Sequence, residues 1–175
     1  MRHIKLAVLT IMAMTLFAGA AAAQKKPVRK TVPVKKPPVA VVPPLDVRAG
    51  REKVDNQLSN VNDFVNKLGT IAQGLETADA DAKAGNLKPV TVAKIKAKKA
   101  EIVEAIRNIK VGLGSLESEF RTKPTLQKYL PTIQGITDLA AQSEDSAIAG
   151  KFVAAKEPLR GVSTKLTDTL NIMPK

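Results

Sequence analysis

The sequence predicts an all-α protein: an antiparallel four-helix bundle, made of one long helical hairpin and two shorter proline-kinked helices, preceded by a disordered Lys/Pro-rich tail. Three observations predict this fold. Apolar residues recur every three or four positions through residues 45–175, which is the period of an amphipathic helix. Glycine, asparagine and proline interrupt that period where helices would begin and end. No stretch alternates apolar and polar residues for long enough to indicate a strand.

Residues 1–23 have the composition of a secretory signal peptide. A basic start at residues 1–5 is followed by a largely apolar run at residues 6–17 and then by three alanines at residues 21–23. This order predicts cleavage before Gln24 and export to the periplasm or the medium. The 18 uncharged residues at 6–23 also approach the length of a membrane-spanning helix, so an inner-membrane anchor is the alternative.

Residues 24–44 form the predicted tail, a basic and proline-rich linker without any acidic residue. Six prolines exclude a helix or a central strand, and like charges repel along the chain, so we expect an extended, disordered segment. At about 3.1 Å per residue it would reach on the order of 65 Å. The tail is either a solvated spacer or a salt-sensitive contact for a polyanion, such as acidic lipid head groups, lipopolysaccharide, wall polymers or nucleic acid.

The two longest apolar patterns predict a helical hairpin close to a coiled-coil seam. The seam of its first helix consists of Val47, Val54, Leu58, Val61, Val65, Leu68, Ala72 and Leu75. The seam of its second helix consists of Val92, Ile95, Ile102, Ile106, Ile109, Leu113, Leu116 and Phe120. Residues 79–88 contain a glycine turn and precede Pro89, which suits the first turn of a helix. Counting outward from this turn places Arg51 of the first helix near Glu117 of the second.

Two shorter apolar patterns predict the third and fourth helices. The pattern of the third runs from Leu126 to Ala140, and Pro131 should kink it or split it in two. A polar turn is expected at residues 142–146, because their serines and acids favour caps and turns. The fourth pattern begins at Ile148 and contains Pro158, a second expected kink. If residues 124–143 were irregular, three helices would be the alternative.

Composition excludes most catalytic chemistry. The chain has no cysteine and no tryptophan, and its one histidine, His3, lies in the predicted signal peptide. Catalysis by Ser-His-Asp or Cys-His, thiol redox chemistry and zinc sites built on His or Cys are therefore excluded from the mature chain. Haem and di-iron sites also lack their usual ligands. We predict no enzyme activity, no cofactor and no metal. The absence of disulfides fits an exported bacterial protein.

Two short motifs fail as catalytic or metal sites. Ser163 and Lys165 lie two residues apart and so face different sides of a helix, which argues against a Ser-Lys pair. Asp79 and Asp81 open like a calcium-binding loop, but Val90 stands where that loop needs its final glutamate. We expect a solvated turn there.

A lysine cluster opens the second helix and provides the remaining candidate site. It either converges on an anion or is an ordinary solvated face. Together with the tail it gives the predicted polyanion-binding set: Lys25, Lys26, Arg29, Lys30, Lys35, Lys36, Lys94, Lys96 and Lys98. The expected function is that of an exported, non-catalytic envelope protein that binds or scaffolds. Its partner would be a protein or an anionic envelope component, the membrane surface included, or a second copy through the helix seams. Export would separate it from nucleic acid.

Overall fold

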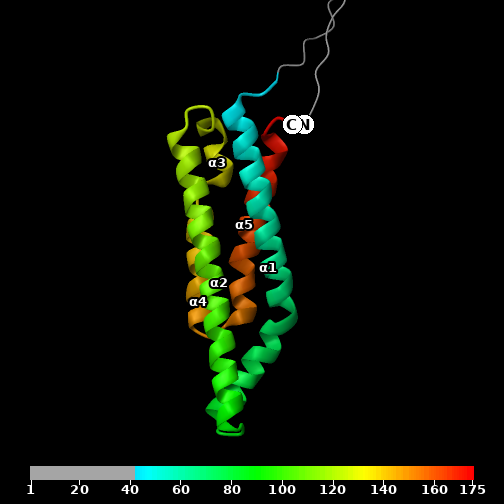
Figure 1. Ribbon diagram of the computed structural model, residues 1–175, viewed down its shortest axis with the longest axis vertical. Coiled ribbons are helices and arrows are strands. Elements are labelled where there is room, and N and C mark those ends of the chain that lie inside the picture. The colour runs from blue at the N-terminus through cyan, green and yellow to red at the C-terminus, as the bar shows by residue number, and fades with distance from the viewer. Residues whose placement is uncertain (1–41) are drawn as a thin grey trace, which may run out of the picture. The chain divides into compact units, whose positions relative to one another are not determined.

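The computed structural model describes residues 42–175, and these residues are helical with no strand among them. Four helices form the bundle: α1 (Leu45–Lys83), α2 (Pro89–Thr122), α4 (Ile136–Ile148) and α5 (Phe152–Ile172). Figure 1 shows these four helices side by side, with successive helices running in opposite directions. Both α1 and α4 pack against α2 and α5, which closes the ring of four. The predicted all-α class and the packing of four helices are confirmed.

The predicted signal peptide lies outside the described residues, and so does the predicted tail except for its last three residues, 42–44. Those three lead directly into the first turn of α1, whose residues Val47 and Arg48 donate backbone hydrogen bonds to the carbonyl of Pro44.

The long hairpin has the predicted turn and nearly the predicted register. Gly85 has a φ of 77° in the connection between α1 and α2, a left-handed conformation that glycine adopts without strain. Gln57 of α1 lies beside Gly112 of α2, because a Cβ built on Gly112 would be 2.9 Å from the side-chain nitrogen of Gln57. This contact lies within one residue of the register counted from the turn.

The region around Pro131 is split, as the sequence predicted. A 3₁₀ helix η1 (Gln127–Tyr129) leads into the single turn α3 (Leu130–Ile133), and Gly135 with a φ of 87° separates α3 from α4. Pro131 lies near the start of α3, where its missing N–H is not needed. Residues 136–148 are a regular helix, so the three-helix alternative is wrong.

The turn after α4 lies later than predicted. Residues 142–146 are helical, and the chain reverses only after Ile148, around Gly150 with a φ of 76°. The turn-forming side chains in 142–146 are satisfied within the bundle instead, as Ser143 shows by donating to the carbonyl of Ala155 at 2.7 Å.

The helix α5 continues without interruption through Pro158. Pro158 removes the helical hydrogen bond to the carbonyl of Ala154, an exposed residue, and α5 continues past it. A bend at Pro158 stays a prediction.

The predicted seams form the core. Side chains with no exposed surface come from every long helix, including Val54, Val61, Ile106, Leu113, Leu159 and Val162. Leu58 and Ile109 are only partly buried and pack against this core from the outside. Gly50 is a point of close approach, because a Cβ there would lie 2.9 Å from Cδ2 of the fully buried Leu126.

Replacing two glycines of α1 tests this packing. Gly74 lies inside α1, and a Cβ there would have no heavy atom within 4 Å. Gly74→Ala should raise the free energy of unfolding by about 1 kcal/mol, because glycine costs that much relative to alanine in a helix interior. Gly50→Ala is the matched control in the same helix and should lower it, since Leu126 must move. Urea denaturation followed by circular dichroism measures both; a stabilising Gly50→Ala would contradict the close approach.

Candidate functional site

Glu117 of α2 caps the first turn of α4. Its Oε1 accepts a hydrogen bond from the backbone N–H of Gly135 at 3.1 Å, and its Oε2 accepts from the hydroxyl of Thr137 at 2.9 Å and from the Thr137 N–H at 3.3 Å. Arg121 pairs with Oε1 at 3.2 Å. Burial acts to raise the pKa of Glu117, but these hydrogen bonds outweigh it and the pKa is lowered. The carboxylate is therefore ionised and fully engaged in holding α4 on α2.

Both ends of α5 are capped by side chains of α1. Arg51 donates to the backbone carbonyls of Leu170 and Met173, the latter at 2.9 Å, at the C-terminal end of α5. Glu76 accepts a hydrogen bond from the N–H of Val153 at 2.7 Å, in the first turn of α5. The predicted pairing of Arg51 with Glu117 is therefore wrong. Arg51 lies against the end of α5, whose free carbonyls attract a guanidinium.

Glu144 of α4 links to α2 through two cations. Its Oε1 accepts from Arg107 Nε at 2.6 Å, and its Oε2 pairs with Lys110. The hydrogen bond from Lys110, followed by the one from Arg107, lowers the pKa of Glu144. Sequence analysis missed Glu144 because it lies in a polar run that resembles a turn. Its only sequence signal is helical spacing from the buried Ala140 and Ala147.

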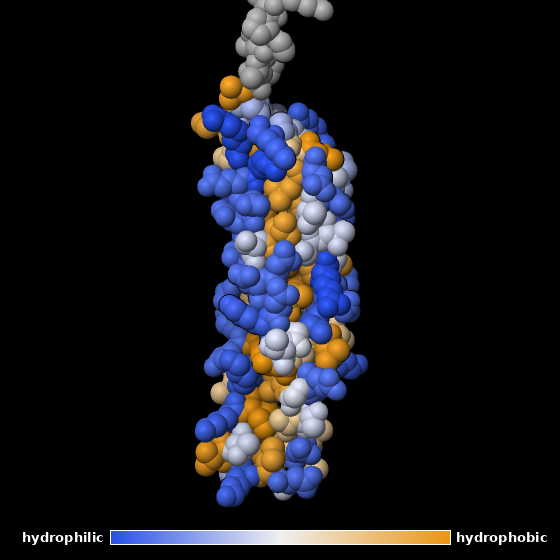
Figure 2. All heavy atoms as spheres, turned by 90° about the vertical axis from the view of Figure 1, so that its right-hand side faces the viewer, coloured by the Kyte–Doolittle hydropathy of each residue, from blue (hydrophilic) through white to orange (hydrophobic). Residues whose placement is uncertain are grey.

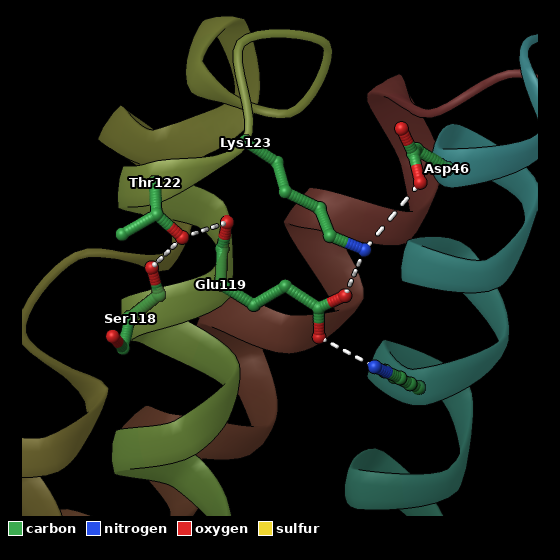
Figure 3. Close-up of polar contacts among 6 residues, drawn as sticks. Asp46, Ser118, Glu119, Thr122 and Lys123 are labelled. Carbon is green, nitrogen blue, oxygen red and sulfur yellow. Dashed lines mark hydrogen bonds and ion pairs between the residues drawn. The ribbon is translucent and has the colours of Figure 1, made fainter.

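A second ionic cluster joins α1 to the C-terminal end of α2 (Figure 3). Glu119 pairs with Lys123 at 2.7 Å and with Lys53 of α1 at 2.6 Å, and Lys123 also reaches Asp46 of α1 at 3.4 Å. The hydrogen bond from Lys123, followed by that from Lys53, lowers the pKa of Glu119. Like Glu117 and Glu144, this carboxylate is committed to holding helices together.

The two motifs rejected at the sequence level have structural partners. The hydroxyl of Ser163 donates to the side-chain oxygen of Asn62 at 2.6 Å. Asp79 pairs with Lys99 at 2.7 Å and with Lys83 at 2.9 Å, and the hydrogen bond from Lys99, followed by that from Lys83, lowers its pKa. Among residues 42–175, no cluster of His, Cys, Asp and Glu has the geometry of a metal site.

The structure gathers the predicted lysine cluster into a larger basic surface, which we call the hairpin tip and define as residues 82–100. The tip comprises the last residues of α1, the turn and the first residues of α2, and it carries six lysines and no acidic residue. Lys94, Lys96 and Lys98 lie on its α2 side, all exposed. Lys83 is the last residue of α1 and Lys88 is the N-cap residue of α2, and the sequence analysis missed both because it counted charges within the second helix only.

Ion pairing leaves half of the tip lysines free. Lys98 pairs with Glu101 at 2.7 Å, and Lys83 and Lys99 share Asp79. The tip lysines that are exposed and form no ion pair with any residue from 42 to 175 are Lys88, Lys94 and Lys96. Three free ammonium groups at one end of the molecule form its best candidate binding surface.

Comparisons of this chain with protein-family models, with curated proteins and with solved structures found no match. Within the part of the chain that the structure describes, no helix combines the length and the apolar character that a membrane span requires.

The lowered pKa values make stability depend on acid pH. For Glu117, Glu119 and Glu144 the folded pKa lies below the ordinary value of 4.5, so their contribution is complete above that pH and is lost as the pH falls through the lowered value. We expect the melting temperature to decline on acidification below pH 4.5. Glu117→Gln or Glu144→Gln should flatten that decline.

The matched control for these two variants is Glu157→Gln, which neutralises an exposed carboxylate whose one ion pair within residues 42–175 is with Arg160. Its melting profile should follow that of the unmodified protein. If neither Glu117→Gln nor Glu144→Gln differed from this control, the proposed ionic linkage between α2 and α4 would be wrong.

Proposed function

We propose that this chain is an exported, non-catalytic helical bundle of the bacterial envelope that binds or scaffolds a partner, with residues 24–44 as a spacer or a polyanion contact. The observation that supports a non-catalytic role is that the buried carboxylates hold helices together. Glu117 and Glu144 are enclosed by donors and cations from neighbouring helices, and their pKa values are lowered. A general acid at neutral pH needs a raised pKa, whereas the pKa values of both carboxylates are lowered.

The shape of the helical hairpin also supports a binding role. Figure 1 shows α1 and α2 continuing beyond the ends of α4 and α5. Most of the core lies outside the hairpin tip: the side chains that are at most 2% exposed lie between Val47 and Ala72 in α1 and between Ile106 and Phe120 in α2, and Ile95, at 9%, is the one buried side chain of the tip. The tip is therefore available for a contact with another molecule.

Export is the first part of the proposal to test. The intact mass of the native protein, measured in separate cell fractions, should correspond to a chain beginning at Gln24 in the periplasm or the medium. A full-length chain in the membrane would support the anchored alternative through residues 6–23. A full-length chain in the cytoplasm would contradict export, and nucleic acid would then become the expected partner of the basic segments.

A polyanion contact is the second candidate function, and the three free lysines of the tip favour it. Heparin serves as a soluble polyanionic probe for the full chain. Replacing the six cations of the tail by glutamine should weaken heparin binding and reduce its salt dependence, since each neutralised contact lowers the salt slope by about one. The substituted residues are Lys25, Lys26, Arg29, Lys30, Lys35 and Lys36.

The control for this tail variant removes the same number of charges from the bundle outside the tip. Its substituted residues are Lys67, Lys128, Lys151, Lys156, Lys165 and Lys175. If heparin affinity and salt slope changed equally in both variants, heparin binding would depend on the net charge of the chain and not on a specific contact with the tail. Unchanged binding by the tail variant would leave the tail as a spacer.

A further inference from the structure

The hairpin tip lies beyond the rest of the bundle. Gly150, in the turn between α4 and α5, marks the level at which those helices end, because a Cβ there would lie 3.6 Å from Asp79 Oδ2 and 3.7 Å from Lys99 Nζ. The tip, residues 82–100, begins at this level and continues outward, and Figure 1 shows it covered by neither α4 nor α5. Its turn is therefore the outermost part of this end of the bundle.

The tip combines its positive charge with exposed apolar surface. Val90 is 69% exposed and stands between the free lysines Lys88 and Lys94. Just behind the tip, Ile148 is 57% exposed and Val153 is 41% exposed. Figure 2 shows hydrophobic residues at the surface near its lower end, which is the end of the bundle that carries the tip, with hydrophilic residues beside them.

A cleft opens between α1 and α2 within the tip. It has a volume of about 320 Å³, and its lining comprises Ala82, Val92, Ile95, Lys83, Lys96 and the ion pair of Asp79 with Lys99. Ile95 is buried and Val92 is half-buried, whereas Lys83 and Lys96 are exposed. Asp79 pairs with Lys83 as well as with Lys99, so Lys96 is the lining cation that has no ion pair among residues 42–175. Apolar side chains beside an exposed cation match a lipid bilayer, in which phosphates lie outside the acyl chains.

We propose that the hairpin tip docks end-on against an anionic lipid bilayer, with Lys88, Lys94 and Lys96 at the phosphates and Val90 in the boundary between head groups and acyl chains. The inference rests on the polyanion contact of the proposed function and names the chemistry of the polyanion. Lysine stems lie along apolar surface while their ammonium groups reach the head groups. A soluble polyanion would leave Val90 in water, and the tip has no aromatic side chain on which nucleic-acid bases could stack.

A fluorescent label reports tip docking directly in the full chain. Because the chain contains no cysteine, Asn86→Cys accepts a single environment-sensitive fluorophore in the turn, and Gln127→Cys places the same label at the opposite end of the bundle. With vesicles of phosphatidylglycerol and phosphatidylcholine, emission from position 86 should shift to the blue while emission from position 127 does not. Vesicles of phosphatidylcholine alone should produce no shift at either position.

Charge and apolar variants then separate the contributions of the tip. In the tail-neutralised full chain, the triple variant Lys88→Gln, Lys94→Gln, Lys96→Gln should bind the anionic vesicles roughly a hundredfold more weakly. Val90→Ser should weaken vesicle binding by up to about tenfold and leave heparin binding unchanged. The matched control, Lys67→Gln, Lys128→Gln, Lys175→Gln, removes equal charge far from the tip and should retain vesicle binding.

Three outcomes would overturn the inference. The first is co-sedimentation with vesicles without an emission shift at position 86, which would place the membrane contact in the tail. The second is an equal loss of vesicle binding in the triple variant and its control. The third is heparin binding that depends on Lys88, Lys94 and Lys96 while vesicles give no shift, which would assign the tip to a polymeric anion. The heparin experiment with the tail variant tests the proposed function alone. Docking of the tip on a membrane is tested separately, by the emission of the label at position 86.

Discussion

The bundle depends on helix ends being capped by side chains of neighbouring helices. The residues that precede its four long helices are Pro44, Lys88, Gly135 and Lys151, and none of them provides a side-chain cap. Serine, threonine, aspartate or asparagine would normally occupy these positions. Long side chains from adjacent helices take over this role for α4 and α5, whose end groups would otherwise lack protein partners. Helix formation and bundle assembly are thereby coupled, since a cap exists only once its donor helix is packed in place.

These caps also determine to which long helix each shorter helix is attached. Glu76 and Arg51 lie 25 residues apart on α1 and fix the two ends of α5, so the length of α5 is matched to that interval of α1. Glu117 fixes the start of α4 on α2, and Glu144 fixes its last turns. Each shorter helix is thus tied to one long helix of the hairpin by polar contacts near both of its ends. The apolar seams between them supply the burial, and the caps fix how far each helix can slide.

The sequence predicted what is local and missed what is tertiary. The hairpin followed from the apolar period, the glycine turn and Pro89, all of which act within a few residues. The location of Arg51 could not be inferred in this way, because its partners lie more than a hundred residues further along the chain. Residues 142–146 have turn-forming composition, yet Ser143 and Glu144 are satisfied by α5 and α2 and remain helical. The candidate site divides similarly. The lysines of α2 form a run that the sequence shows directly, whereas Lys83 of α1 joins them only because the turn reverses the chain.

Unequal helix lengths give this fold an exposed end. α1 has 39 residues and α4 has 13, which correspond to about 58 Å and about 20 Å of helix. α4 and α5 must therefore end while the hairpin continues, and the lysines of the tip keep this uncovered end hydrated. α2 has 34 residues and returns alongside α1, so the uncovered end is a pair of helices joined by their turn.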